Sequence, residues 1–129
     1  MDLQLRNKVA LISGGSKGIG FSTARAFAKE GCNLGICSRN ESEVRDAKEE
    51  LEELGVRVIA VQADVCQPES AKAFVEKSAK EFGRIDFLVN NVGGGIGGST
   101  VLSTSDDDWI TTFELNLFQA IRLTRIVVP

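Results

Sequence analysis

The sequence of 129 residues contains no histidine and no tyrosine. Two of the side chains that most often act as general acids or bases are therefore absent from it. The three cysteines, Cys32, Cys37 and Cys66, form no CxxC pair. An odd number of widely spaced cysteines is typical of free thiols in a reducing cytosol and argues against a zinc site. We therefore expect a cytoplasmic protein without a metal ion.

Long apolar runs and a surplus of positive charge are also lacking. No run approaches the roughly 18–20 residues of a membrane span, and the first residues lack the basic and apolar segments of a signal peptide. Lys and Arg number 15 against 18 Asp and Glu, whereas binding to nucleic-acid phosphates requires clustered positive charge. With 43% hydrophobic and 26% charged residues, the chain has the composition of an ordinary globular protein. We expect residues 1–129 to form a single domain that binds neither nucleic acid nor membranes.

What the sequence does contain is a regular alternation of short apolar runs and longer amphipathic segments. Strands are predicted at 9–12, 34–37, 56–61 and 85–89, and helices at 19–30, 41–54, 68–82 and from 106 onward. Such short strands joined by helices run parallel with right-handed crossovers, so helices cover both faces of the sheet. The sequence therefore predicts the doubly wound α/β class, a Rossmann-type parallel sheet represented by its first four or so βα units.

Two of the predicted helices begin with recognisable caps. Asn40 is expected to cap the second helix, with Glu43 three residues later as its capping-box partner. Ser105 is expected to cap the last helix, and three aspartates follow at 106–108. We interpret these aspartates as a complement to the positive end of the helix dipole and not as metal ligands.

A glycine-rich turn links the first predicted strand to the first helix. Within Ser13-Gly14-Gly15-Ser16-Lys17-Gly18-Ile19-Gly20, Gly14 permits a tight turn, Gly18 lets the backbone approach a diphosphate, and Gly20 lets the helix pack close to the sheet. The helix N-terminus directs free N–H groups and positive dipole potential at the phosphates. Although turns with three glycines also occur as purely structural features, the strand and helix on either side favour dinucleotide binding by residues 14–20.

The glycine spacing GxxxGxG resembles the turn TGxxxGxG of the short-chain dehydrogenase/reductase family, with Ser13 in place of the usual threonine. Further segments match family motifs in the same order: Asp64-Val65, which corresponds to the acidic-hydrophobic pair at the adenine end; Asn90-Asn91-Val92-Gly93, which is similar to NNAG with Val92 replacing alanine; and Asn116, which matches the asparagine of the catalytic tetrad. The resemblance covers essentially the whole chain, and it is to the classical type, similar to 3-oxoacyl-carrier-protein reductases. It implies that these residues contact a nicotinamide cofactor or support its chemistry.

The residues after the second strand distinguish between the two nicotinamide cofactors. A carboxylate there would bond the adenosine ribose and repel a 2′-phosphate, but this strand ends in Cys37-Ser38-Arg39. Arg39 offers a planar donor fork that suits phosphate, Ser38 adds a hydroxyl, and Lys17 supplies a second cation. Surface cations are usually only solvated, which is the alternative interpretation. We favour NADP(H) over NAD(H).

Catalysis in the family uses a tyrosine, a lysine, a serine and an asparagine, of which only the asparagine position, Asn116, is matched here. The YxxxK motif is absent because the chain has no tyrosine. We therefore expect an N-terminal cofactor-binding half whose catalytic Ser and YxxxK segment follow Pro129, and which is inactive by itself. The resemblance implies that the parent protein exchanges a hydride between NADP(H) and a carbonyl or alcohol substrate of unidentified structure. The alternative is a truncated nucleotide-binding or partner-binding module without catalysis.

The last predicted helix has apolar residues on two sides, whereas an outer helix of a monomer needs only one apolar stripe. One side carries Trp109, Phe113, Leu117, Ala120 and Val127, and the other carries Ile110, Phe118, Ile121 and Val128. Either downstream structure or another subunit covers the second side, and both can hold together. Because the fourth strand would also be left as a sheet edge, we expect the isolated chain to be poorly stable or oligomeric. The family resemblance implies a homo-oligomer, dimer or tetramer, formed through this helix.

Overall fold

A computed structural model describes residues 1–129 and contains a four-stranded parallel sheet in the order β3-β2-β1-β4. The strands are β1 (Val9–Ser13), β2 (Asn33–Ser38), β3 (Val58–Gln62) and β4 (Phe87–Val89). The helices are α1 (Gly18–Lys29), α2 (Glu41–Glu52), α3 (Pro68–Phe82), α4 (Asp106–Phe113) and α5 (Gln119–Val127), together with a 3₁₀ turn, η1 (Val101–Ser103), and a π-helical segment, η2 (Glu114–Phe118). The predicted doubly wound α/β class is confirmed.

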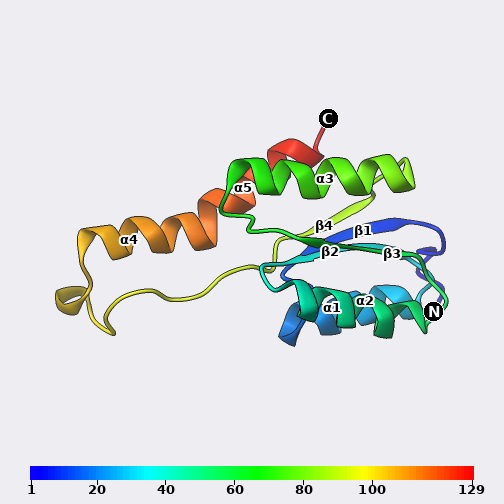
Figure 1. The fold of residues 1–129 in the computed structure, drawn as a ribbon, viewed down its shortest axis with the longest axis horizontal. Helices are drawn as coiled ribbons and strands as arrows, with labels where there is room; N and C mark the ends of the chain where they lie inside the picture. The colour runs from blue at the N-terminus through cyan, green and yellow to red at the C-terminus, as the bar shows by residue number, and fades with distance from the viewer.

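Helices cover both faces of the sheet: α1 and α2 lie on one face, and α3 and α5 on the other (Figure 1). Successive side chains of a strand point to opposite faces, so Ala10 and Ile12 of β1 enter the core under α1 and α2, while Val9 and Leu11 enter the core under α3 and α5. All of β1 is buried. This explains why its sequence is a continuous apolar run and not an alternating one.

Two predicted strands begin later than the sequence indicated. Strand β3 starts at Val58 and not at residue 56, and β4 starts at Phe87 and not at residue 85. Val56 packs against the core under α1 and α2, and Ile85 packs against the opposite core. These residues are apolar because they pack against the two cores, although neither belongs to the ladder of the sheet.

The last helix also differs from its prediction as one regular helix. Its two halves, α4 and α5, are joined by the π-helical turn of η2, and α4 extends away from the sheet (Figure 1). No residue of α4 is buried, whereas Gln119 and Leu123 of α5 are fully buried against the body of the protein. Trp109 and Phe113 therefore remain 42% and 49% exposed, so neither apolar side of α4 packs on the sheet. None of the helices combines the length and the apolar character that crossing a bilayer requires.

Candidate functional site

The turn between β1 and α1 has the backbone geometry that its glycines suggested. Gly14 and Gly18 have φ angles of +65° and +59°, in the left-handed region that glycine adopts most readily. The backbone N–H groups of residues 16–20 donate to no other group of the chain, because the first N–H groups of a helix lack intrahelical acceptors. The mouth of α1 therefore presents unpaired donors at the positive end of the helix dipole.

Close packing holds this turn against the segment after β4. A Cβ atom on Gly20 would overlap the carbonyl oxygen of Gly14 and the side-chain amide of Asn91. The Asn91 Nδ2 atom donates to that carbonyl oxygen at 3.1 Å. The Ser13 hydroxyl accepts hydrogen bonds from the backbone N–H groups of Asn91 (3.1 Å) and Val92 (3.4 Å). Ser13 and Asn91 thus join the glycine turn to the end of β4, which is a structural role for both.

A cleft of about 1330 Å³ lies at the carboxyl ends of the strands. The sheet order reverses between β1 and β4, and ligands of open α/β sheets bind beside such a switch point. The cleft brings together predicted residues from four separate segments: Gly14, Ser16, Lys17, Ser38, Arg39, Asp64, Val65, Asn91, Val92 and Gly93. Tertiary structure thus collects most of the predicted cofactor residues into one cavity.

The remaining predicted cofactor residues do not line this cleft. Gly15 and Gly20 are buried beneath the turn, while Gly18 and Ile19 are exposed at the mouth of α1. Asn90 points elsewhere, because its Nδ2 atom hydrogen-bonds Thr124 Oγ1 of α5 at 3.2 Å. Several other lining residues belong to no recognisable motif and were not predicted: Gln62, Gln67, Gly95, Ile96 and Thr111.

Two cations stand at the β2 end of the cleft, and they differ in their partners. Arg39 is exposed, and its guanidinium makes no hydrogen bond or ion pair, although its backbone carbonyl accepts from Gln62 Nε2 at 3.1 Å. Lys17 Nζ lies 3.6 Å from the carboxylate of Glu43. The predicted capping box is therefore wrong in one half: Asn40 Oδ1 does accept from the backbone N–H of Glu43, but the backbone N–H of Asn40 donates to Ser38 Oγ. The Glu43 carboxylate engages Lys17 instead of the helix cap.

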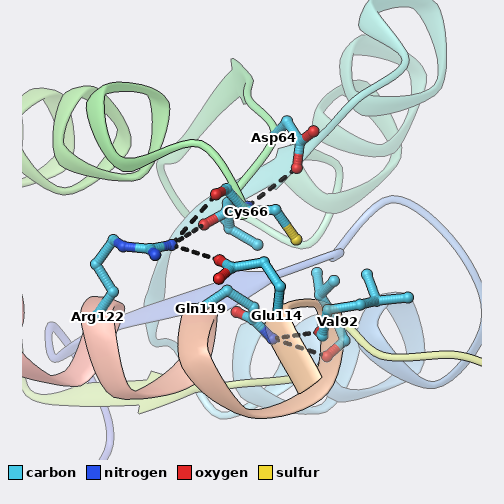
Figure 2. Close-up of polar contacts among 8 residues, drawn as sticks. Asp64, Cys66, Val92, Glu114, Gln119 and Arg122 are labelled. Carbon is cyan, nitrogen blue, oxygen red and sulfur yellow. Dashed lines mark hydrogen bonds and ion pairs between the residues drawn. The ribbon is translucent and has the colours of Figure 1, made fainter. Parts of the chain in front are cut away.

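The loop after β3 is held in part by Arg122 and Glu114, two side chains that were not predicted from the sequence. Arg122 of α5 lies 3.3 Å from the carbonyl oxygen of Cys66 and 3.0 Å from the carboxylate of Glu114 (Figure 2). Asp64 accepts a hydrogen bond from the backbone N–H of Cys66 at 3.0 Å. Burial, together with the negative charge of Asp64, raises the pKa of the Cys66 thiol, so this thiol is a poor nucleophile at neutral pH. No periodic pattern in the sequence predicts the contact between Arg122 and the loop after β3, because the two are far apart in the chain.

Asn116 lies in the π-helical segment, outside the residues that line the cleft. Its Nδ2 atom donates to the carbonyl oxygens of Gly94 (2.7 Å) and Thr112 (2.9 Å), and its Oδ1 atom accepts from the N–H of Gly94 (3.0 Å). The buried Gln119 adds a parallel contact, since its Nε2 atom donates to Val92 O at 3.0 Å (Figure 2). Asn116 therefore ties the last helix to the loop after β4.

Comparison with known proteins supports the family resemblance that the motifs suggested. The family model described as short chain dehydrogenase matches residues 8–129. The chain belongs to the short-chain dehydrogenase family. It is 39% identical over 126 residues to an uncharacterised oxidoreductase of Mycobacterium tuberculosis, a match that covers 98% of this chain and 48% of the relative. The chain spans about half the length of the curated relatives it matches.

Solved structures of the family have the same fold. The chain superposes with a TM-score of 0.95 and 41% identity on L-sorbose reductase from Gluconobacter frateurii, complexed with NADPH and L-sorbose, over 100% of this chain and 49% of the other. An NAD⁺-bound xylitol dehydrogenase matches with a TM-score of 0.90 and 28% identity, over 96% of this chain and 48% of the other. Structures similar to this chain thus include one complexed with NADPH and one bound to NAD⁺.

The cleft of this short-chain dehydrogenase has the donors that a phosphorylated dinucleotide requires. The unpaired N–H groups at the mouth of α1 suit a diphosphate, and adding a Cβ at Gly18 would meet no atom within 4 Å, which leaves open space beside them. The unpaired Arg39 guanidinium suits a further phosphate.

Proposed function

We propose that this chain forms the NADP(H)-binding part of an oxidoreductase that exchanges a hydride with a carbonyl or alcohol substrate. The observation that carries the proposal is the presence of two unsatisfied donors in one cleft: the free backbone N–H groups of Ser16 and Lys17, at the mouth of α1, and the free guanidinium of Arg39. The nicotinamide, when bound, supplies or accepts the hydride. The residues of the chain bind and orient the cofactor.

Each part of the cleft has its own role in this proposal. Residues 14–20 hold the diphosphate against the helix dipole, and Asp64 and Val65 hold the adenine end. The segment from Asn91 to Gly93 shapes the side of the cleft next to β4. Asn116 holds the backbone of Gly94, so it positions the loop that follows this segment.

Preference for NADP(H) over NAD(H) is the second half of the proposal. Strand β2 ends at Ser38 with no carboxylate, and it is followed by Arg39, an exposed residue that lines the cleft. A carboxylate at this place would bind the ribose hydroxyls, whereas an arginine favours a 2′-phosphate through charge-assisted hydrogen bonds. The 41% identity to the NADPH-complexed L-sorbose reductase supports the same choice.

Titration with both cofactors tests this function. In the Arg39→Asp variant, the affinity for NADPH should fall by about 10-fold or more, since a charge-assisted hydrogen bond is replaced by repulsion. The affinity for NADH should rise, because the new carboxylate can bind the ribose hydroxyls. Arg25→Asp, on the exposed side of α1 and outside the cleft, is the matched control and should bind NADPH as the wild type does. Absence of NADPH binding by the folded wild-type chain, or unchanged binding by the Arg39 variant, would overturn the proposal.

The alternative function is a nucleotide-binding or partner-binding module that performs no catalysis. The absence of tyrosine favours it for these 129 residues alone, and we expect them to bind NADPH without reducing any ketone. Intact-mass measurement of the natural protein distinguishes the two functions. A mass near 13.9 kDa favours the module, and a mass about twice as large, as the relatives' lengths suggest, favours the enzyme.

We also propose that a second copy of the chain covers the last helix. Ile110, Leu117, Phe118 and Ile121 are each 44% to 64% exposed along it, and exposed apolar patches of this kind favour association. Light scattering should therefore detect dimers or tetramers, and Ile110→Lys should shift the population toward monomers. A monodisperse, cooperatively melting wild-type monomer would refute this proposal. The substrate is taken to be a small molecule, and nucleic acid and membranes are not expected partners.

A further inference from the structure

The two cations at the β2 end of the cleft are not equally available to a ligand. Lys17 and Glu43 both line the cleft, and their charged atoms are 3.6 Å apart. The Lys17 side chain is 79% exposed and that of Glu43 is 39% exposed. Arg39, on the same part of the cleft, has no charged partner. One of the two positive charges that would meet an adenosine 2′-phosphate is thus already engaged by a carboxylate.

We propose that Glu43 weakens the binding of NADP(H), and so reduces its preference over NAD(H), by competing with the 2′-phosphate for Lys17. This inference rests on the proposed function. A phosphate that contacts Lys17 must draw the ammonium away from the Glu43 carboxylate, which costs the energy of the ion pair. A ribose with a free 2′-hydroxyl makes no such demand. Glu43 therefore acts on one cofactor and not on the other, which makes it a specificity-determining residue.

The local structure leaves Glu43 free for this role. Its carboxylate does not cap α2, because the Asn40 backbone N–H that a capping box would offer already donates to Ser38 Oγ. The backbone N–H of Glu43 is bound by Asn40 Oδ1, so the helix start survives a change of the Glu43 side chain. Glu41 also lines the cleft but forms no ion pair, so its charge is not directed at Lys17.

The experiment compares Glu43→Gln with a variant that removes the same charge from the same helix. Glu52 pairs with Lys48 at 3.8 Å and lies outside the cleft, so Glu52→Gln is the matched control. Because exposed ion pairs are weak, we expect Glu43→Gln to tighten NADPH binding by about two- to fivefold and to leave NADH binding unchanged. Glu52→Gln should alter neither affinity. In a Lys17→Met background, Glu43→Gln should no longer tighten NADPH binding.

Several outcomes would overturn the inference. An unchanged NADPH affinity in Glu43→Gln would mean that Glu43 does not compete for Lys17, and a weaker affinity would mean that the pair preorganises Lys17. Equal effects of Glu43→Gln and Glu52→Gln would indicate net charge alone, and an effect that persists without Lys17 would indicate direct repulsion. The proposed function fails on a different result: if the wild-type chain binds no NADPH, both proposals fail. If the wild type binds NADPH, the Arg39→Asp variant does not, and Glu43→Gln leaves the affinity unchanged, only the proposal for Glu43 fails.

Discussion

Replacing Gly20 by alanine tests how tightly the glycine turn is packed. The added Cβ would overlap the Gly14 carbonyl oxygen and the Asn91 side-chain amide, which hydrogen-bond each other at 3.1 Å. Overpacking costs about 1–3 kcal/mol, and loss of the hydrogen bond costs about 1 kcal/mol. The higher helix propensity of alanine offsets about 1 kcal/mol of this destabilisation. We therefore expect the free energy of unfolding to fall by about 1–3 kcal/mol, with weaker NADPH binding.

Urea unfolding followed by circular dichroism, together with NADPH titration, measures both effects. Gly95→Ala is the control, because Gly95 has a negative φ and a Cβ there would meet no atom within 4 Å; its stability should stay within about 0.5 kcal/mol of the wild type. Gly18→Ala separates strain from packing, since Gly18 has a positive φ but open space, and should cost about 1–2 kcal/mol. A Gly20→Ala variant with wild-type stability and affinity would refute the reasoning.

Hydrogen bonds from Arg84 lower the pKa of Asp86. The stabilising contribution of Asp86 is therefore present above the unfolded pKa of about 3.9 and is lost as the pH falls through the lower folded value. In the Asp86→Asn variant, the urea midpoint should therefore depend less on pH between about pH 5 and 2 than in the wild type. Burial raises the pKa of Cys32 to about 11 and that of Cys37 to about 12, so in a chromogenic thiol assay only Cys66 should react in the native chain, and slowly, whereas all three should react in urea. Ser13→Ala removes the acceptor of two backbone N–H groups and should lower the free energy of unfolding by about 1–3 kcal/mol; equal urea midpoints for this variant and the wild type would contradict that role.

Helix positions and the alternation of strands and helices were accessible from the sequence because they depend on local patterns. Neighbouring residues indicate which positions are buried in the apolar run at β1 and in the amphipathic helices α2 and α3. The glycine turn is likewise recognisable from residues close together in the chain. Parallel strands with right-handed crossovers then permit few sheet arrangements. Strand ends were less accessible. Val56 and Ile85 are apolar because they pack against the cores, and composition alone does not separate that role from membership of a strand.

The sequence by itself determined the alternating βα architecture and the four segments that line the cleft, since each is encoded by residues close together in the chain. Only the tertiary structure decided which charges are paired. Lys17 meets Glu43, and Arg122 meets Glu114 and the carbonyl of Cys66, across elements that no periodicity relates. Arg39, by contrast, is left without a partner. Ion pairs depend on distances of a few ångströms between separate elements, and those distances exist only after the sheet and its helices have packed.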